Sequence, residues 1–402
     1  MVLSLAACEP ETVMPSKVVR DYLKRITPLR RGIRALKSLV SRNREDFWII
    51  EGQEQTSQQP FRLFFSGQLE NRNYIAHLIM GDSWTETVSS RTWKKSLLKR
   101  ARAENAGNDL VVIQTDKIPS AAALGPNGFV VPCWVGGEKN LHEATELARH
   151  SDHIKSDVRR IRKNRLGYRV TRDPAEFSSF YYTMYLPYIK QVYGDHALLM
   201  SYEEMQAAID QCELFLITQD DQDIAGGILV YNESDLVRGW SLGVKDGDFR
   251  WVKAGALAAF EYLQTGYLLD KGYKRLHRGG SRPFLNDGAL SFKKNRGMTI
   301  TGRKSSWFTI IPVRDNAGVR GFLTHNPFIY EKEGTLKGAI FMTGEVISKD
   351  SISRLFRNSY IAGLDGLTLF CLSPGQDHGL SIQACGNIDK SGTLQPSLSG
   401  TN

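Results

Sequence analysis

Short hydrophobic blocks separated by polar turns dominate the first third of the chain, a pattern typical of β-strands. Residues 85–106 are interpreted as a helix with a strongly basic surface. Strands are predicted at 47–51, 62–66, 74–81, 109–115 and 129–135. This order of strands, helix and strands indicates an α/β domain.

From Pro174 onward, amphipathic helices and strands follow one another. An aromatic-rich helix at 174–193 precedes a second helix at 202–210, where Ser201 and Glu204 predict a capping box. Further helices are predicted at 253–271 and 289–296, with strands at 214–218, 224–231, 236–243, 273–279 and 299–312. The order is two helices, three antiparallel strands, helix, strand, helix, strand. It predicts an α/β (α+β) fold with a mixed sheet flanked by helices.

The two ends of the chain differ from this pattern. Residues 1–44 form a basic arm with a weak helical pattern, which could contact a phosphate backbone or membrane, or pack as a solvated helical hairpin on the next domain. Residues 313–375 carry strands and a helix that could complete the sheet or form an accessory subdomain. Residues 376–402 are rich in Gly, Ser, Asp and Pro and predict a flexible tail.

Composition narrows the class of protein. The chain has 402 residues, which favours at least two domains, and a net charge of +9, which favours anionic partners. Its five cysteines form no CxxC pair, which argues against a disulfide framework or zinc site and favours a reducing compartment. No apolar run reaches transmembrane length, so we expect a soluble, cytoplasmic protein without a transmembrane segment or metal.

Two basic segments are candidate anion sites. The helical stretch 141–167 carries the densest charge run, and could dock phosphates, RNA or an acidic carrier, or simply link two domains. The glycine-rich loop 279–288 leads into a helix, an arrangement that suits anions, although ordinary turn glycines before a solvated helix explain it equally well. Its candidate ligand-binding residues are Ser281, Arg282, Lys293 and Lys294.

Four stretches together resemble the GNAT acyltransferase superfamily, most closely its FemAB-like branch and the CelD-like bacterial acetyltransferase domain. They are the basic segment 156–163, the aromatic helix 180–185, the Ala-Gly-Gly strand 225–228 and the Phe-Lys helix end 290–297. The resemblance covers residues 150–310. It implies a GNAT-like mixed sheet, and in that branch two such folds often pack together.

The same resemblance implies transfer of an acyl or aminoacyl group from a thioester or ester to an amine. The donor would be acyl-CoA or acetyl-CoA, an acyl carrier protein or an aminoacyl-tRNA. The acceptor would be a small-molecule or glycan-precursor amine. The chain departs from the coenzyme A loop of the family, because residues 247–256 hold Arg250, Lys253 and Gly255 at the wrong spacing.

Acyl transfer needs a polarised carbonyl, a positioned nucleophile and a route for its proton. In a GNAT-like fold a strand that parts from its neighbour offers free backbone N–H groups to the carbonyl oxygen, and we place this parting at Trp240 and Ser241. Candidate bases are Asp287, Glu203 and His196. Cations around Asp287 are expected to lower its pKa, and a helix N-cap is its alternative role.

Tyrosines of the aromatic helix would line any cleft that this helix borders, and are otherwise core residues. The candidates are Tyr185, Tyr188 and Tyr193.

The predicted domains are a basic arm (1–44), a degenerate GNAT-like domain (45–148), the transferase domain (149–312), accessory elements (313–375) and the tail (376–402). A competing hypothesis is a non-catalytic GNAT-like module that binds RNA, a glycan or an acidic carrier protein through its basic helices. A third is tRNA-dependent aminoacyl transfer.

Overall fold

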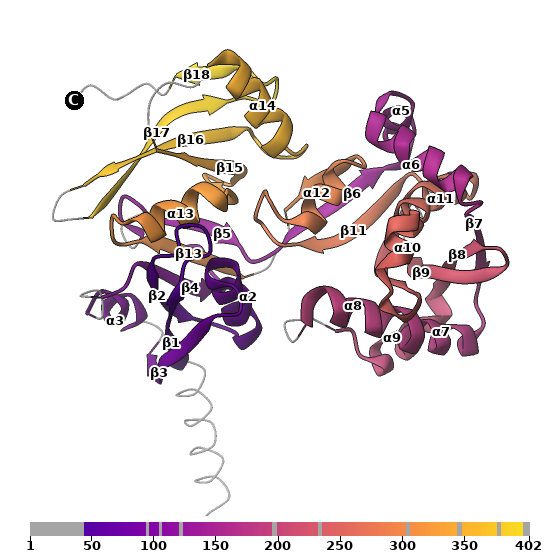
Figure 1. Cartoon of the computed structure of the whole chain (residues 1–402), viewed down its shortest axis with the longest axis horizontal. Helices are drawn as coiled ribbons and strands as arrows, with labels where there is room; N and C mark the ends of the chain where they lie inside the picture. The colour runs from indigo at the N-terminus through magenta and orange to yellow at the C-terminus, as the bar shows by residue number, and fades with distance from the viewer. Residues whose placement is uncertain are drawn as a thin grey trace, which may run out of the picture.

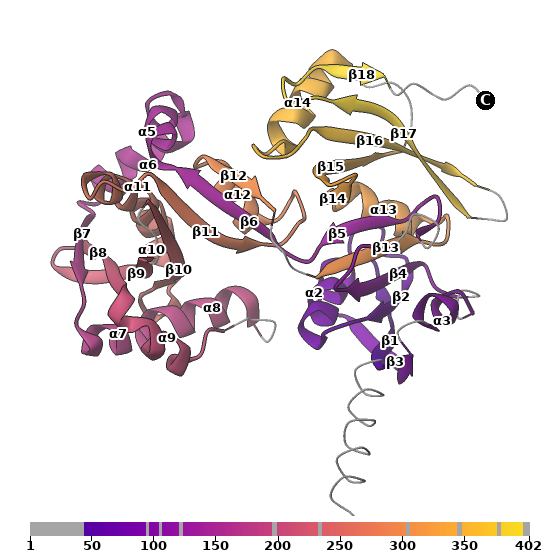
Figure 2. The ribbon, with the colours of Figure 1, turned by 180° about the vertical axis from the view of Figure 1, so that it is seen from behind.

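The computed structural model describes residues 44–93, 96–103, 107–119, 124–194, 199–231, 235–302, 306–343, 348–375 and 379–396. Two mixed sheets form two lobes (Figure 1). The view from behind shows that strands β6 (Val135–Asn140) and β11 (Arg275–Ser281) run between the lobes (Figure 2). The fold is therefore α/β with two sheets, as predicted. Apart from Arg44, the basic arm lies outside the described residues.

The second sheet has seven strands in the order β12-β6-β11-β10-β9-β8-β7. Successive residues of its strands point to opposite faces, so that Phe215 and Ile217 join one core and Leu214 and Leu216 join another. The first core lies under helix α11 and the second under the aromatic helices. The bounds are β6 (Val135–Asn140), α5 (Leu141–His150), α6 (Asp152–Lys163), β7 (Gly167–Thr171), α7 (Pro174–Phe180), η3 (Tyr181–Tyr185), α8 (Leu186–Tyr193), α9 (Tyr202–Ala208), η5 (Ile209–Gln211), β8 (Cys212–Gln219), β9 (Gln222–Tyr231), β10 (Leu236–Val244), η6 (Lys245–Gly247), α10 (Phe249–Ala254), α11 (Ala256–Asp270), β11 (Arg275–Ser281), α12 (Gly288–Lys294) and β12 (Met298–Thr301).

The first sheet has eleven strands in the order β18-β17-β16-β15-β14-β5-β13-β4-β2-β1-β3. Helices α2 and α13 cover one face, where Ile79 and Phe322 are buried, and α3 covers the other. The bounds are β1 (Arg44–Gln53), β2 (Pro60–Ser66), α2 (Leu69–Met80), β3 (Trp84–Trp93), α3 (Leu97–Ala103), β4 (Leu110–Thr115), β5 (Phe129–Pro132), β13 (Trp307–Pro312), α13 (Ala317–His325), β14 (Phe328–Lys332), β15 (Thr335–Met342), α14 (Lys349–Ser359), β16 (Leu367–Pro374), β17 (Leu380–Ile388) and β18 (Leu394–Pro396).

The two sheets exchange strands reciprocally. Strand β6 leaves the first lobe and inserts between β11 and β12, and β13 leaves the second lobe and inserts between β4 and β5. The predicted boundary at 148 therefore does not separate the sheets, and the single strand expected at 299–312 is two strands in different sheets. A shared core that includes Leu290 and Ile340 joins the lobes further.

The order predicted from Pro174 is confirmed as far as β12, but three elements elsewhere were predicted wrongly. Residues 74–81 lie mostly in helix α2, because Ile75, Ala76, Ile79 and Met80 form one buried helical face. The first part of the helix expected at 85–106 is strand β3, an exposed edge strand paired with β1, and residues 97–103 are helix α3 as expected. The stretch 141–167 contains two helices and the start of β7, because the Ser151 side chain caps α6.

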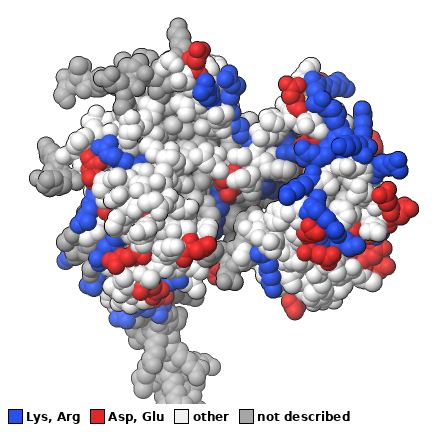
Figure 3. Space-filling view, in the orientation of Figure 1, with Lys and Arg blue, Asp and Glu red and all other residues white. Residues whose placement is uncertain are grey.

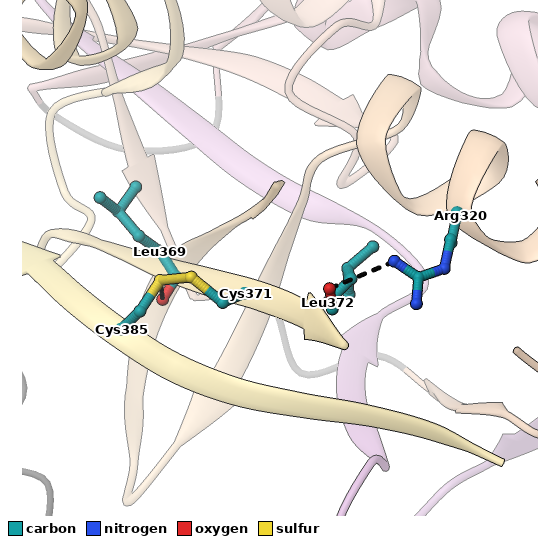
Figure 4. The surroundings of a disulfide bond; sticks show 5 residues. All are labelled: Arg320, Leu369, Cys371, Leu372 and Cys385. Carbon is teal, nitrogen blue, oxygen red and sulfur yellow. Dashed lines mark hydrogen bonds between the residues drawn. A yellow bond between two sulfur atoms is a disulfide. The ribbon is translucent and has the colours of Figure 1, made fainter. Parts of the chain in front are cut away.

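The C-terminal region extends the first sheet. Strands β14 to β16 complete it, and β17 and β18 occupy residues for which we expected a flexible tail. Cys371 and Cys385 of neighbouring strands form a disulfide with a Cα–Cα distance of 5.9 Å (Figure 4), which corrects the expectation of no disulfide. None of the helices in the described part of the chain has the length and apolar character that a bilayer crossing requires.

Candidate acyl-transfer site

Strands β10 and β11 part soon after they meet. Their parallel pairing covers three positions, from Leu236 opposite Arg275 to Arg238 opposite His277. Beyond Arg238, β10 continues to Val244. Over this part it pairs only with β9 among the described residues. The parting predicted near Trp240 is thus present, and it leaves one edge of β10 unpaired.

Irregularities in both strands explain the parting. The register of β10 against β9 shifts between Gly239 and Ser241, which makes Trp240 a bulged residue. The register of β11 against β6 shifts between His277 and Gly280, where Gly279 has a φ of 70°. Bulges bend a strand and increase its twist, and two bulges on facing strands drive the strands apart.

The surroundings of Gly239 leave room for no more than ordinary contacts. A Cβ built on Gly239 would lie 3.6 Å from the backbone oxygen of His277 and 3.9 Å from the side chain of Leu276. The half-buried Trp240 packs against the core under the aromatic helices, and its ring lies 5.8 Å from the guanidinium of Arg238. The buried hydroxyl of Ser241 makes no hydrogen bond among the described residues, which is unusual for a buried polar atom.

The far end of β10 is held by a π-helix. A Cβ on Gly243 would lie 2.5 Å from the backbone carbon of Met184, so the π-helix Tyr181–Tyr185 packs directly on the strand. The hydroxyl of Tyr185 accepts a hydrogen bond of 2.8 Å from the N–H of Met200. Tyr185 therefore supports the wall of the gap through its buried ring, and π-helical turns occur frequently at functional sites.

Helix α12 packs against the end of β11, the strand on the other side of the gap. The amine of Lys293 lies 2.9 Å from the backbone oxygen of Gly280 and 2.9 Å from the hydroxyl of Ser281. Burial first and the nearby charge of Arg278 second lower the pKa of Lys293 to about 7, against the opposing charge of Asp287. An amine with this pKa is largely neutral at slightly alkaline pH and can accept a proton.

Asp287 begins helix α12. Its carboxylate accepts a hydrogen bond of 2.8 Å from the N–H of Leu290, so the N-cap role is present. Burial raises the pKa of Asp287 and outweighs the opposing charges of Lys293 and Arg282. The expected lowering of this pKa was wrong, because the loss of hydration exceeds the attraction of the cations.

Arg282 and Lys294 are engaged away from the gap. The guanidinium of Arg282 lies between the rings of Tyr74 and Trp134, at 4.1 and 3.9 Å, and donates to Asn71 at 2.8 Å. The amine of Lys294 donates to two backbone oxygens at the end of α14, at 2.7 and 2.6 Å. Both residues therefore fasten the second lobe to elements of the first sheet.

The three candidates for donor binding lie around the start of α11. Gly255, with a φ of 100°, ends α10 and begins α11 without a side-chain cap. A Cβ on Gly255 would lie 2.9 Å from the side chain of Arg160, so this arginine covers the helix start. Arg250 pairs with Asp248 at 2.8 Å, and Lys253 is exposed. The N-terminus of a helix beside arginines favours an anion.

The remaining candidates take no clear part in the gap. His196 lies outside the described residues, and the side chain of Tyr193 is also outside them. Tyr188 lies 6.2 Å from the ring of Phe249, and Glu203 is exposed on α9. Among the residues that the structure describes, no group of three or more His, Cys, Asp or Glu could hold a metal ion.

Two clusters of buried charged groups in the second lobe were missed from the sequence. Arg278 of β11 pairs with Glu261 of α11, and both side chains are buried, 8% and 5% exposed. Glu213 accepts hydrogen bonds from Lys271, Tyr231, Tyr267 and Arg172. These pairs bring together residues far apart in the chain, and no local pattern announces them.

Comparisons with known proteins return structures only. No protein-family model matches the chain, and none of the curated proteins matches its sequence.

Three of the similar solved structures show how low the similarity is. The C-terminal domain of a putative lysylphosphatidylglycerol synthetase from Agrobacterium fabrum has 10% identity and a TM-score of 0.31, over 66% of this chain and 80% of that one. L-PGS from Bacillus licheniformis has 9% identity and a TM-score of 0.33, and the match covers 69% of this chain and 84% of that one. A GCN5-related N-acetyltransferase-like protein from Streptococcus suis has 9% identity and a TM-score of 0.27, and the match covers 66% of this chain and 83% of that one. These values are too low to carry a statement about function.

Proposed function

We propose that the protein is an N-acyltransferase of the GNAT type that moves an acyl or aminoacyl group to an amine. The single observation that carries this proposal is the parting of β10 and β11 after Arg238. It leaves one edge of β10, from Gly239 to Val244, without a strand partner among the described residues. A carbonyl placed there would meet preorganised N–H donors.

The walls of the gap supply the other requirements. In the transfer step the amine nitrogen bonds to the carbonyl carbon, the bond to the sulfur or oxygen of the donor breaks, and the amine loses a proton. We assign acceptance of that proton to Lys293. When neutral it donates two hydrogens, to Gly280 and Ser281, and keeps one lone pair free. The unpaired Ser241 hydroxyl is available to the substrate.

The donor is proposed to carry an anionic portion. The start of α11, with Arg160 across Gly255 and with Arg250 nearby, fits a phosphate group. Acyl-CoA or acetyl-CoA satisfies this requirement, and so do the carrier-protein and aminoacyl-tRNA donors of the FemAB-like branch. The proposed acceptor is a small-molecule or glycan-precursor amine.

A donor-discharge assay tests the proposal. The full chain is incubated with acetyl-CoA and a panel of primary amines, and release of free thiol is followed. A parallel reaction uses aminoacyl-tRNA with the same amines. We expect amine-dependent discharge of one donor, reduced in Lys293→Met. Discharge of neither donor above the rate without protein contradicts acyl transfer.

A specific observation favours the second candidate, a non-catalytic module that binds an anionic partner. Lys and Arg gather on the surface of the second lobe (Figure 3), and exposed Arg159 and Arg162 of α6 make no ion pair among the described residues. Thermal shift separates the candidates. Stabilisation by coenzyme A at physiological salt supports the transferase, and stabilisation by polyanions alone, lost in salt, supports the module.

A further inference from the structure

A cavity of about 920 Å³ lies between helices α5, α6 and α11, outside the proposed acyl-transfer site. The helices leave this space because small residues face it, namely Ala144, Ala148, Ala258 and Gly266. A cavity of this size accommodates a small-molecule ligand. The proposed acyl-transfer residues Gly239, Trp240, Ser241 and Lys293 do not line it, so the cavity is a separate feature of the second lobe.

The charge of the lining is unbalanced. Six cations and four carboxylates line the cavity. Asp157 is already paired with Arg296, and Glu261 is paired with Arg278. Arg159 and Arg162 are exposed and lie three residues apart on α6, and so on one side of the helix, and their side chains make no ion pair or hydrogen bond among the described residues.

One of the cations is buried. Lys139 is 4% exposed, and its amine makes one hydrogen bond, 2.8 Å to the hydroxyl of Thr265, among the described residues. An ammonium group carries three donors, so this contact leaves the group short of acceptors. Burial lowers the pKa of Lys139, as do the charges of Arg278 and Arg296. An anion in the cavity would offset the effect of burial and the repulsion by Arg278 and by Arg296.

The rest of the lining is apolar. Ala148, Ile154, Val158 and Leu269 line the cavity together with the cations. Free inorganic phosphate would leave this surface in contact with water, whereas a ligand with an apolar portion would cover it. Two arginine forks suit the geometry and the double charge of a phosphate monoester.

We propose that the cavity between α5, α6 and α11 binds a phosphate monoester that carries an apolar chain. The phosphate lies between Arg159, Arg162 and Lys139, and the chain lies along the apolar walls formed by α5 and α11. This proposal is independent of acyl transfer, because it concerns a different part of the lobe and is tested by binding alone.

Calorimetric titration of the full chain with hexyl phosphate, inorganic phosphate and hexanol tests it. We expect hexyl phosphate to bind at least about tenfold more tightly than inorganic phosphate, and hexanol not to bind measurably. In the double variant Arg159→Gln, Arg162→Gln we expect affinity to fall about tenfold or more. Ala148→Leu, which fills the cavity and keeps its charge, should reduce hexyl phosphate to the level of inorganic phosphate.

The matched control is Lys163→Gln, Arg165→Gln. It removes the same charge at the last residue of α6 and two residues beyond it, at positions that do not line the cavity, and should change affinity less than about twofold. Equal weakening in both double variants, or no preference for hexyl phosphate, overturns the proposal.

Vesicles of phosphatidylcholine with and without phosphatidic acid distinguish the two sources of such a ligand. Binding of the phosphatidic acid vesicles through Arg159 and Arg162 indicates a membrane lipid, and binding of hexyl phosphate alone indicates a soluble ester.

Discussion

Each sheet contains a parallel strand pair at a corresponding place, and the two pairs differ. In the first sheet β2 and β4 pair over four positions up to Ser66, the last residue of β2. In the second sheet β10 pairs with β11 over three positions and then continues without a strand partner on that edge, although it stays paired with β9 on the other. The first pair thus forms a continuous ladder, and the second opens into a gap.

Side chains beyond the paired segments account for the difference. After β2, a Cβ on Gly67 would lie 2.5 Å from Gln114, whose amide oxygen accepts from Gln68 and Asn71 at 2.9 Å each. After the β10 pairing, the space beside Gly239 contains no comparable side chain. One fold pattern therefore yields a closed structural lobe and an open lobe, depending on which residues follow the parallel pair.

Filling the gap should have the largest effect. Gly239→Ala adds a methyl group whose nearest neighbour is 3.6 Å away, so the fold accepts it and the space proposed for a carbonyl is reduced. We expect amine-dependent discharge to fall about 1,000-fold while stability changes by less than about 1 kcal/mol. Gly67→Ala in the first sheet is the control. It should lower the melting temperature, because its φ is 147° and Gln114 is close, and leave the rate unchanged.

Reducing the disulfide should affect the first lobe alone. Cys371 and Cys385 are 14 residues apart in the chain, and closing a loop of that length contributes about 3 kcal/mol in the chain-entropy description. Cys371→Ser is therefore expected to lower the denaturant midpoint and leave discharge unchanged. A loss of activity at full folding would show that the first lobe takes part in the chemistry.

Lys293→Met should lower the rate about 100-fold and remove its pH dependence. Because the pKa of Lys293 is about 7, the wild-type rate rises as pH increases through 7 and then levels off. The folded pKa lies below the ordinary value of 10.5, so stability also increases with pH between these values, and the variant loses this increase.

Lys294→Met is the matched control for that experiment. The amine of Lys294 holds the end of α14, so this variant should lose some stability. The pH profile of its discharge rate should match that of the wild type. A pH profile in Lys293→Met identical to the wild type contradicts the role of Lys293 as proton acceptor.

Glu213→Gln should have the smallest effect of the four. Burial raises the pKa of Glu213, but hydrogen bonds from Lys271, Tyr231, Tyr267 and Arg172 outweigh burial and lower the pKa to about 2. The stabilisation is present above the unfolded pKa of about 4.3 and is lost as pH falls through 2. We expect the variant to lose about 2 kcal/mol at neutral pH, because two of the partners are partly exposed, and to lose this acid dependence. Denaturant titrations from pH 2 to pH 7 measure both.

The order of elements and the parting at Trp240 were predictable because they depend on local signals. Apolar periodicity marks the helices and strands from Pro174 onward, and glycines at Gly239 and Gly279 accompany the bulges. The strand exchange was not predictable in this way. Residues 299–301 and 307–312 both have the pattern of a strand, and that pattern does not specify the sheet to which each strand belongs.

The chemistry of the site was only partly predictable. Lys293 stood out as a basic residue near a loop, but its lowered pKa depends on burial of α12 against β11, which is a tertiary feature. The Arg278–Glu261 pair and the Glu213 network likewise join separate elements. Arg282 was assigned to an anion because the sequence does not reveal that Tyr74 and Trp134 enclose it.

Amide hydrogen exchange tests the central claim most directly, namely that an activated carbonyl occupies the gap between β10 and β11. Exchange is measured residue by residue in the full chain, with and without a non-hydrolysable thioether analogue of acetyl-CoA. We predict slower exchange at residues 239–244 and at the start of α11, with no change at residues 63–66 of the closed pair. Binding of the analogue without protection at 239–244, or with equal protection in both sheets, would contradict the account.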